Sequence, residues 1–455
     1  MLPVDFVESI TAELGAHEAQ ALCRALDTPS PTAVRLNPLK MSRWRGVEQT
    51  TRVPWCSDGY YLESRPQFTL DSAFHAGAYY VQEPSSQFVG HLLSARDMQG
   101  ARLLDLCAAP GGKSTLYSTL VGRDGLVVAN EIDHRRAQVL ADNVRKWGMG
   151  NVVVTCNDAS RLAQAEQWFD VVAVDAPCSG EGMFRKDIAS REEWSLNNVK
   201  LCSSRQDEIL RHAWSALKAG GVLIYSTCTF NRSEDEGTLE RFLAEFGDEV
   251  ESMPRVKCPE EWGVECGEVG AFATYRFFPH KAAGEGFFAA VACKAESARC
   301  KVKPLKSRRT IFSQCDKATV GELSRWVVEP EKMRFMMIGD LCYGYRAEQV
   351  EAVKMLSESL SVITSGVEMG QIFKGRLRPE HGLAMYVDLN RGAMPIAELV
   401  ESRALDYLRK RDISAEGFEQ GINLVSAEGL AIGFAKCIGA RVNNMYPNSL
   451  RIMNK

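Results

Sequence analysis

Residues 102–113, RLLDLCAAPGGK, form an apolar run that ends in small residues and two glycines. An apolar run of this length is typical of a buried strand, and a glycine-rich turn after it is typical of a strand that leads into a helix. Similar runs follow, each succeeded by a loop and an amphipathic segment: GLVVAN (125–130), NVVVTC (151–156), FDVVAVD (169–175) and GVLIYSTC (221–228). This alternation predicts an α/β fold, a parallel sheet with helices on both faces.

Shorter patterns flank the alternating segment on both sides. Apolar residues recur at helical spacing from about residue 4 to 25, and extended pieces such as AVRLNPL (33–39) follow. YRFFPH (275–280) and GEGFFAAVAC (284–293) are expected to pair as a hairpin that closes the sheet. We therefore expect a small α+β module before the main domain.

The second half of the chain predicts a further unit. A helix is expected over 231–246, where Ser233 and Glu236 have the spacing of a capping box. Residues from about 318 combine short helices and strands with glycine-rich turns and show no internal repeat. The expected boundaries are 1–75 for the N-terminal module, 76–295 for the α/β domain, 296–317 for a basic linker and 318–455 for the C-terminal region.

The composition limits the classes of protein to which the chain can belong. The chain has 455 residues, 45% hydrophobic and 25% charged, as expected for two or three globular domains. It opens on MLPVDFVESI, without the basic start of a secretory signal, and no apolar run approaches the ~20 residues that span a bilayer. The fourteen cysteines show no metal-ligand spacing, so reduced thiols are expected. We expect a cytoplasmic protein, favour a monomer, and expect neither a metal nor a membrane partner.

The charge distribution limits how nucleic acid could bind. The formal net charge of −4 gives no global attraction to RNA, so binding would rest on local basic patches. Six cations form the densest patch, in the expected linker: Arg299, Lys301, Lys303, Lys306, Arg308 and Arg309. Two smaller patches are Lys374, Arg376 and Arg378, and Arg409, Lys410 and Arg411.

The turn after the first strand of the alternation is suited to a nucleotide-like ligand. Its residues are Cys107, Ala108, Ala109, Pro110, Gly111, Gly112 and Lys113. Small side chains let a ligand approach the backbone, and the N-terminus of the following helix offers free N–H groups to an anionic group. A phosphate-binding P-loop is excluded by spacing, because that motif needs a glycine where Cys107 stands.

The next two strands of the alternation end in acidic residues. Glu131 follows the second strand, where a carboxylate can accept hydrogen bonds from both ribose hydroxyls of a nucleoside. Asp158 follows the third and could accept from the exocyclic amine of adenine. Each acid alone is as consistent with helix capping, but three suitable strand ends in order favour a ligand site.

The fourth and fifth strands end in cysteines. The fourth runs into Asp175, Pro177 and Cys178, and the fifth into Cys228. Chance can place one buried cysteine at a strand end. Two at neighbouring ends, one beside a carboxylate, indicate covalent chemistry by a thiol.

The motifs at these strand ends resemble a known family. DLCAAPGGK (105–113), DAPCSGEG (175–182) and YSTCT (225–229) closely resemble the motifs of the Sun (nucleolar-protein) family of RNA cytosine-5 methyltransferases. MFRKD (183–187) is most similar to the family's bacterial ribosomal RNA methyltransferase F branch. The resemblance extends over most of the chain, through RLNPLK, YYVQEPSS, FFPHKAAGEGFF and, in a PUA-like C-terminal module, GLAIGFAKCIGARVNNMYPNSLR.

The resemblance implies a Rossmann-like methyltransferase domain between an N-terminal RNA-binding module and a C-terminal PUA-like RNA-binding region. It implies that residues 107–113, with Glu131, Asp158 and Asp175, hold S-adenosylmethionine. Cys228 matches the family's nucleophile, and Cys178 matches the cysteine assigned to product release. The implied substrate is a cytosine of RNA, and the branch favours small-subunit (16S) ribosomal RNA.

The chemistry explains why such residues are needed. Carbon 5 of cytosine becomes nucleophilic only after a thiolate, here from Cys228, adds to carbon 6. Asp175, protonated or sharing a proton with the ring nitrogen, would stabilise the charge that enters the ring. The base must first leave its stack, and Arg185 and Lys186 could then contact the RNA backbone.

Two other functions remain open from the sequence. One is an RNA-binding ribosome assembly factor that keeps the fold without catalysis, which the intact cysteine pair argues against. The other is an amino-group methyltransferase, but that chemistry usually needs an aromatic residue after a proline-rich turn. Here Cys178 follows Pro177.

Overall fold

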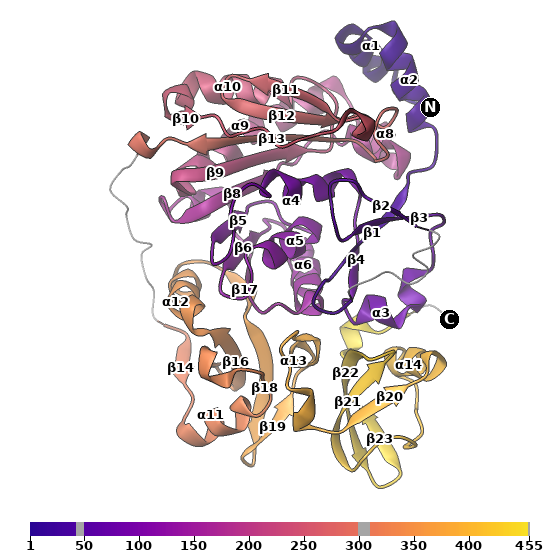
Figure 1. Cartoon of the computed structure of the whole chain (residues 1–455), viewed down its shortest axis with the longest axis vertical. Helices are drawn as coiled ribbons and strands as arrows, with labels where there is room; N and C mark the ends of the chain where they lie inside the picture. Colours follow the sequence, from indigo (N-terminus) through magenta and orange to yellow (C-terminus); the bar gives the residue numbers. More distant parts are fainter. Residues whose placement is uncertain (42–49, 299–309, 454–455) are drawn as a thin grey trace.

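The computed structural model describes residues 1–41, 50–298 and 310–453. A ten-stranded sheet occupies the upper part of the molecule, and smaller sheets lie beside and below it (Figure 1). Its order is β11-β12-β13-β9-β8-β5-β6-β7-β17, with β10 paired to β13. The strands are β5 (Arg102–Asp105), β6 (Leu126–Asn130), β7 (Val152–Thr155), β8 (Phe169–Asp175), β9 (Leu217–Thr227), β10 (Val250–Glu251), β11 (Glu265–Val269), β12 (Phe272–Phe277), β13 (Phe287–Lys294) and β17 (Val362–Ser365).

The apolar runs of the sequence form the centre of this sheet. Strands β9, β8, β5, β6 and β7 pair in parallel, which confirms the α/β prediction. Successive side chains point to opposite faces, so Val127 and Val128 of β6 enter two different hydrophobic clusters. Burial on both faces explains why the strands are continuously apolar rather than alternating.

Helices cover both faces of the sheet. On one face lie α4 (Phe88–Leu92), α5 (Gly112–Leu120) and α6 (His134–Trp147), which contribute Phe88, Leu116 and Leu140 to the core. On the other lie α7 (Ala159–Leu162), α9 (Leu196–Ala216) and α10 (Glu236–Phe246), which contribute Leu210 and Leu239. Because these strands are parallel, their carboxyl ends all lie at the same edge of the sheet.

The strand order reverses direction between β5 and β8. From β5 the chain proceeds to β6 and β7 on one side and then crosses to β8 and β9 on the other. Ligands of open α/β sheets bind beyond the carboxyl ends of the strands at such a switch point. The motifs at residues 105–113, 175–182 and 225–229 all lie at this place.

The C-terminal region contributes to the large sheet, which the sequence did not predict. Strand β17 pairs antiparallel with β7, and α12 (Val350–Ser359) packs Val353 and Leu356 into the core of the large sheet. The backbone N–H of Cys156 also donates to the carbonyl of Ser361 at 2.8 Å. This pairing covers the edge of β7 that would otherwise expose unpaired backbone groups.

The N-terminal region packs in two places. Helices α1 (Val4–Leu14) and α2 (Ala16–Leu26) place Phe6 5.1 Å from the ring of Phe184, beside the loop that follows β8. A four-stranded antiparallel sheet with order β2-β3-β1-β4 lies closer to α6. Its strands are β1 (Thr32–Leu36), β2 (Thr51–Arg52), β3 (Gly59–Leu62) and β4 (Tyr79–Val81), and η2 (Phe68–Leu70) and α3 (Ser72–His75) precede β4.

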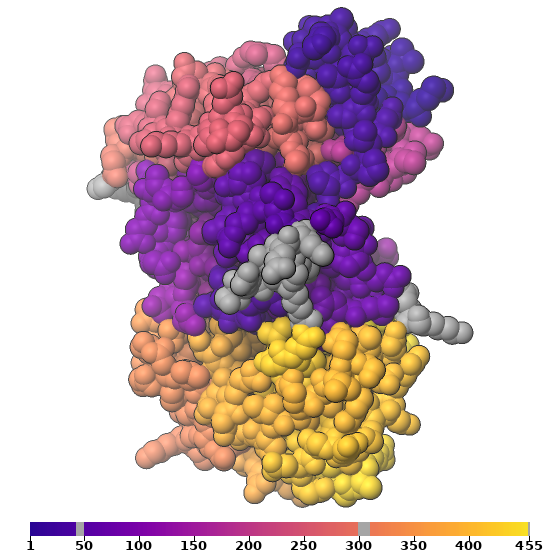
Figure 2. Space-filling model, turned by 45° about the vertical axis from the view of Figure 1, so that its right-hand side comes forward, coloured from indigo at the N-terminus to yellow at the C-terminus, as the bar shows by residue number. Residues whose placement is uncertain are grey.

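Two further sheets form the lower half of the molecule, in orange and yellow in Figure 2. One contains β14 (Phe312–Gln314), β15 (Met333–Ile338), β16 (Leu341–Arg346), β18 (Val367–Phe373) and β19 (Arg376–Pro379), accompanied by α11 (Lys317–Ser324). The other contains β20 (Ile396–Leu399), β21 (Gly421–Ala427), β22 (Leu430–Ile438) and β23 (Arg441–Asn444), with α14 (Glu401–Leu408), and α13 (His381–Met385) lies between the two. No helix among the described residues is long and apolar enough to cross a membrane.

One prediction from the sequence is wrong, and another concerns residues outside the described ranges. The capping-box prediction is wrong, because α10 begins only at Glu236, and the side chain of Glu236 pairs with Arg276 at 2.6 Å instead. The densest basic patch, 299–309, lies outside the described residues. The domain boundaries stay a prediction, although β14, within the expected linker, already pairs with β15.

Candidate active site

Two cysteine thiols meet at the switch point. Strands β8 and β9 run in parallel with Asp175 beside Ser226, so the loops that follow leave the sheet on the same side. The Sγ atoms of Cys178 and Cys228 lie 3.3 Å apart and share a hydrogen bond. That hydrogen bond, together with burial, raises the pKa of Cys178 well above its usual range.

The two sulfurs have different access to the cavity at this edge. The cavity has a volume of about 250 Å³, and Cys228 lines it whereas Cys178 does not. Cys178 adjoins the cavity through its contact with Cys228, and both thiols are partly exposed. Only Cys228 is placed to attack a molecule in the cavity, because a nucleophile must reach the reacting atom.

A partly buried ion pair faces the same cavity. Lys113 Nζ donates to Asp175 Oδ2 at 2.8 Å, and Ser226 Oγ donates to Oδ1 at 2.9 Å. Burial alone would lower the pKa of Lys113, but the Asp175 carboxylate beside it raises that pKa overall. The pair and the Ser226 hydroxyl hold both carboxyl oxygens of Asp175 at the cavity wall, and the role expected for Asp175 from the sequence stays a prediction.

The loop after β5 gets its shape from its backbone. Gly111 has φ 110°, and a Cβ atom there would meet Leu140 Cδ1 at 3.0 Å, so this position requires glycine. Helix α5 begins at the next residue and directs its first N–H groups toward the site. The residues of this loop that line the cavity are Cys107, Ala108, Ala109, Pro110, Gly112 and Lys113.

Asp105 is a cavity residue that the sequence analysis did not assign. Its Oδ2 accepts a hydrogen bond from Ser114 Oγ at 2.7 Å, whereas its buried Oδ1 has no partner among the described residues. Burial raises the pKa of Asp105 to about 7. A buried carboxylate oxygen without a donor fits a cationic ligand group such as the ammonium of S-adenosylmethionine.

The other two acids expected at the cofactor site do not line the cavity. Glu131 is buried, accepts from the backbone N–H of Asp133 at 3.1 Å and pairs with Arg136 at 3.3 Å. Asp158 is exposed and caps α7 by accepting from the backbone N–H of Ser160 at 2.9 Å. Their contacts with ribose and adenine stay predictions, since both lie at the strand ends but already have partners.

Residues from distant segments complete the cavity walls. Tyr80 and Gln82 come from β4 and the turn after it, Glu285 comes from the turn before β13, and Phe287 is the first residue of β13. Both stretches carry the family resemblance, but no site residue was predicted in either of them. No local pattern marks them, because they reach the site only through pairing of the N-terminal sheet and of β13.

The side-chain amide of Asn231 joins the two cysteine loops, which are the loops after β8 and β9 that carry Cys178 and Cys228. Asn231 donates through its side-chain amide to Glu181 Oε1 at 3.0 Å and to Glu234 Oε1 at 2.7 Å. Glu181 follows Cys178, while Asn231 and Glu234 follow Cys228, so the bond to Glu181 ties one loop to the other and the bond to Glu234 lies within the second loop. All three side chains are buried.

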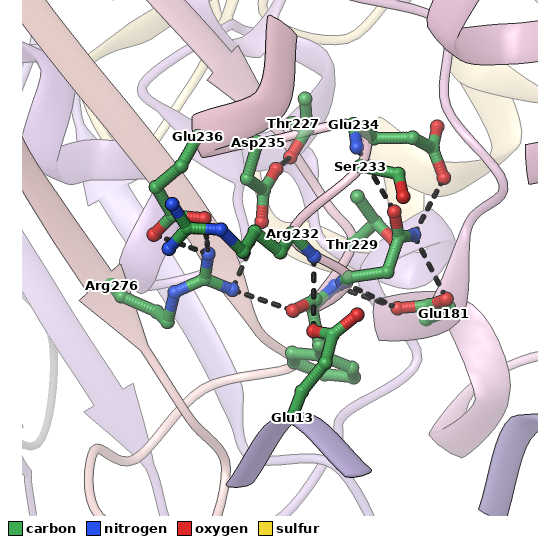
Figure 3. Close-up of polar contacts among 12 residues, drawn as sticks. Glu13, Glu181, Thr227, Thr229, Arg232, Ser233, Glu234, Asp235, Glu236 and Arg276 are labelled. Carbon is green, nitrogen blue, oxygen red and sulfur yellow. Dashed lines mark hydrogen bonds and ion pairs between the residues drawn. The ribbon is translucent and has the colours of Figure 1, made fainter. Parts of the chain in front are cut away.

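The same carboxylates also hold the loop backbones. Glu234 Oε2 accepts from the backbone N–H of Ser179 at 2.9 Å, next to Cys178. Glu181 Oε2 accepts from the backbone N–H of Phe230 at 2.7 Å, two residues after Cys228. Figure 3 shows the side chains of Glu181 and Glu234 among the polar contacts of the segment that follows β9. The separation of the two sulfurs is thus set by buried side chains.

A second group of charges fixes the end of β9. Arg276 of β12 pairs with Asp235 at 3.0 Å and with Glu236 at 2.6 Å, and its guanidinium also donates to the Phe230 carbonyl at 2.7 Å (Figure 3). Thr227, directly before Cys228, donates to Asp235 Oδ1 at 2.6 Å. Arg276 therefore anchors the strand end that presents Cys228.

The two cations expected to contact RNA have partners in the chain. Arg185 donates to the carbonyls of Pro29 at 2.6 Å and Gly284 at 2.5 Å, so it ties the N-terminal segment to the active-site loops. Lys186 lies 3.7 Å from Glu285 and lines the cavity, with its side chain half exposed. Lys186 stays a candidate for RNA contact, whereas Arg185 is engaged within the fold.

In the described part of the chain, no group of three or more His, Cys, Asp or Glu side chains could hold a metal ion.

Some cations of the smaller basic patches have partners within the fold. Lys410 Nζ donates to the carbonyl of Tyr446 at 2.6 Å, and Arg411 pairs with Asp406 at 3.0 Å.

Comparison with protein-family models gives three matches along the chain. The model described as 16S rRNA methyltransferase RsmB/F matches residues 92–292. The N-terminal domain of 16S rRNA methyltransferase RsmF matches residues 2–84, and the methyltransferase RsmF PUA domain matches residues 395–452. The matches agree with the Rossmann-like domain and the C-terminal PUA-like region expected from the sequence.

Curated relatives match over the full length. Ribosomal RNA small subunit methyltransferase F of Aeromonas salmonicida is 31% identical, covering 99% of this chain and 97% of its own. The protein of the same name from Enterobacter is 30% identical and covers 98% and 95%. The similarity therefore extends over nearly the whole length of this chain and of these relatives.

Solved structures match a large part of the chain. A methyltransferase homolog from Pyrococcus horikoshii is 28% identical, with a TM-score of 0.54, over 64% of this chain and 94% of its own. The NSun6 protein of the same organism, at 20% identity and a TM-score of 0.54, covers 64% of this chain and 98% of its own, and supports the fold alone.

Proposed function

Because the chain belongs to the ribosomal RNA small subunit methyltransferase F family, we propose that it methylates carbon 5 of a cytosine through a covalent bond to Cys228. The observation that carries this proposal is the thiol pair at neighbouring strand ends, with a separation of 3.3 Å and only Cys228 lining the cavity. An amino-group methyltransferase has no use for this pair.

The first step is addition of the Cys228 thiolate to carbon 6 of the ring. The carbon–sulfur bond forms as the electrons of the 5,6 double bond move toward carbon 5 and the ring nitrogen. The Cys178 sulfur lies 3.3 Å from that of Cys228, within hydrogen-bond distance of the attacking atom. Lys113 and Asp175 face the same cavity, where the Lys113 ammonium, or a proton that Asp175 shares with the ring nitrogen, would stabilise the negative charge that enters the ring.

The proposed cofactor is S-adenosylmethionine, which supplies an electrophilic methyl group to carbon 5 when bound. Residues 107–113 would approach it through their backbone, and Asp105 Oδ1 offers an acceptor that no described residue uses. Glu131 and Asp158 lie at the next strand ends, where they would bind ribose and adenine. The methyl donor and the thiolate would thus reach the same ring from neighbouring strand ends.

Release of the product is the proposed role of Cys178. Once Cys228 is bonded to carbon 6, its sulfur is a neutral thioether. The hydrogen bond with Cys228, which is the main cause of the raised pKa of Cys178, is then lost. The Cys178 thiol then loses its proton to solvent, and its thiolate takes the proton from carbon 5. The electrons of that C–H bond re-form the ring double bond and expel Cys228 as a thiolate.

The proposed substrate is small-subunit (16S) ribosomal RNA, after the names of the relatives, and the site of action is then the cytoplasm. The C-terminal PUA-like region would hold the RNA while the target base leaves its stack to enter the cavity.

Two cysteine variants test the covalent mechanism. With radiolabelled 16S rRNA and S-adenosylmethionine, Cys178→Ala is expected to accumulate a protein–RNA adduct that survives denaturing electrophoresis. Cys228→Ala is expected to form neither adduct nor methylated RNA. Cys202→Ala, a buried cysteine of α9 outside the cavity, serves as the control and should keep wild-type activity. Loss of activity in both site variants without any adduct would overturn the division of roles.

A further inference from the structure

Two further cavities continue from the active site toward the C-terminal region. The second cavity, of about 390 Å³, shares Tyr80 and Val81 with the active-site cavity. The third, also about 390 Å³, shares Phe74 and Lys146 with the second and reaches Arg451. We call the second and third cavities together the flank groove. It is lined among others by Arg65, Phe68, Phe74, Tyr80, Lys146 and Arg451.

The groove lies where three parts of the chain meet. The side chain of Phe74 comes from α3, Lys146 comes from α6, and Arg451 follows β23 near the C-terminal end of the chain, which lies beside α3 in Figure 1. Tyr446 Oη lies 3.4 Å from Nδ1 of His75, which fixes the C-terminal sheet against α3. The groove therefore needs the N-terminal, catalytic and C-terminal parts together.

The groove carries positive charge that the fold does not neutralise. Arg65, Lys146 and Arg451 have no ion-pair partner within residues 1–41, 50–298 and 310–453. The one carboxylate that lines the groove, Asp142, pairs with Arg145 at 2.9 Å. An anion in the groove would meet cations without competing acids.

Aromatic rings lie next to these cations. Lys146 Nζ is 3.8 Å from the centre of the Phe74 ring, and the Arg65 guanidinium is 5.5 Å from that of Phe68. The rings of Phe74 and Tyr80 are only partly buried. Burial lowers the pKa of Lys146 to about 8, which a nearby phosphate would raise again.

We propose that the flank groove binds the single-stranded RNA adjoining the cytosine in the active-site cavity, an inference that rests on the proposed function. Cations that follow a path, interleaved with aromatic rings, match the alternating phosphates and bases of an unpaired strand. Tyr80 marks the junction, because it lines both the active-site cavity and the groove. An acidic peptide would use the cations but not a path that continues into the active site.

Salt-dependent binding of a short RNA tests this inference. The probe is a fluorescein-labelled oligocytidylate of about twelve nucleotides, and the protein is the full chain saturated with S-adenosylmethionine. The groove variant combines Arg65→Gln, Lys146→Gln and Arg451→Gln. The control combines Lys200→Gln, Arg205→Gln and Lys257→Gln, three exposed cations that line none of the three cavities.

The groove variant is expected to bind the probe at least tenfold more weakly than wild type near ~0.1 M salt. Its slope of log affinity against log salt should be shallower by about 2, at roughly 0.7 per lost phosphate contact on a single strand. The control is expected to stay within about twofold of wild type. Equal loss in both triple variants, or no loss in the groove variant, would overturn the proposal, as would failure of the wild type to bind the probe.

Two additions keep the test decisive. If Lys146→Gln disturbs the fold, Arg65→Gln and Arg451→Gln at exposed positions should each still lower the affinity, whereas wild-type affinity in both would count against the groove. Binding of S-adenosylmethionine should be unchanged in every variant. The Cys178→Ala adduct assay is independent of this comparison: absence of an adduct with normal probe binding would reject the covalent mechanism and leave the groove standing.

Discussion

The loop after β5 and the two loops after β8 and β9 open into the same cavity, but different interactions hold them in place. The loop after β5 gets its shape from glycine, proline and small side chains, and it leaves Asp105 Oδ1 without a partner in the described residues. The cysteine loops are held by buried carboxylates and Asn231, which use most of their hydrogen-bonding capacity. A loop that binds a ligand can leave polar atoms without protein partners, because the ligand supplies them. A loop that positions a nucleophile needs its hydrogen bonds formed before the substrate binds.

The largest effect on stability is expected where the anchor of the cysteine loops is a buried charge. Arg276→Met leaves Asp235 buried without its cation, so the free energy of unfolding should fall by about 3–5 kcal/mol in urea titrations. Arg232→Met is the control, because Arg232 pairs with Glu240 on the surface and that pair contributes less than about 1 kcal/mol. Similar losses in the two variants would mean that Arg276 does not anchor the loop.

In the loop after β5, the expected effect is a pH dependence of the free energy of unfolding, caused by Asp105. Asp105 has a pKa of about 7 in the folded protein against an ordinary 3.8, so the folded state holds its proton more tightly than the unfolded state. The resulting stability is fully present below about pH 4 and is lost as the pH rises through 7. Without cofactor, wild type should lose about 2–3 kcal/mol relative to Asp105→Asn between pH 5 and pH 8.

Parallel unfolding curves for wild type and Asp105→Asn across this pH range would contradict the assignment. S-adenosylmethionine should reduce the pH dependence of the wild type, because its ammonium would give the ionised Asp105 a partner. Asp170→Asn is a suitable control, since Asp170 already pairs with Lys218 at 2.6 Å near the surface.

Asn231→Ala should have a smaller effect on stability and a clear effect on turnover. The substitution leaves Glu181 and Glu234 each short of one donor, at a cost of about 1–3 kcal/mol. Because the amide sets the spacing of the two cysteine loops, kcat should fall about tenfold or more while the KM for S-adenosylmethionine stays unchanged. Asn197→Ala, at an exposed position of α9, should change neither. A variant with normal kcat would show that the loops hold their places without this amide.

The contrast also explains what the sequence could and could not reveal. The parallel sheet, the turn at 107–113 and the cysteines follow from local patterns, because buried strands and glycine turns leave continuous signatures. Glu181 and Asn231 lie 50 positions apart and meet only after β8 and β9 pair, so no spacing rule indicates their contact. Strand β17 was missed for the same reason, since its partner β7 lies about 200 residues earlier.

The smallest expected effect separates two roles of Asp158. Asn caps a helix about as well as Asp, so Asp158→Asn should keep the stability of the protein, whereas Asp158→Ala should cost about 1 kcal/mol. If the carboxylate also accepts from adenine, both variants should bind S-adenosylmethionine more weakly in calorimetric titrations. Full affinity in Asp158→Asn would leave Asp158 as a helix cap only.

Trapping the wild-type protein on 16S rRNA that contains 5-fluorocytosine probes the thiol chemistry most directly. Fluorine on carbon 5 cannot depart as a proton does, so the ring should remain attached to the protein after methyl transfer. Digestion and mass spectrometry should then locate the nucleotide on the peptide that carries Cys228. Attachment at Cys178, or no attachment at all in folded protein saturated with S-adenosylmethionine, would contradict the account.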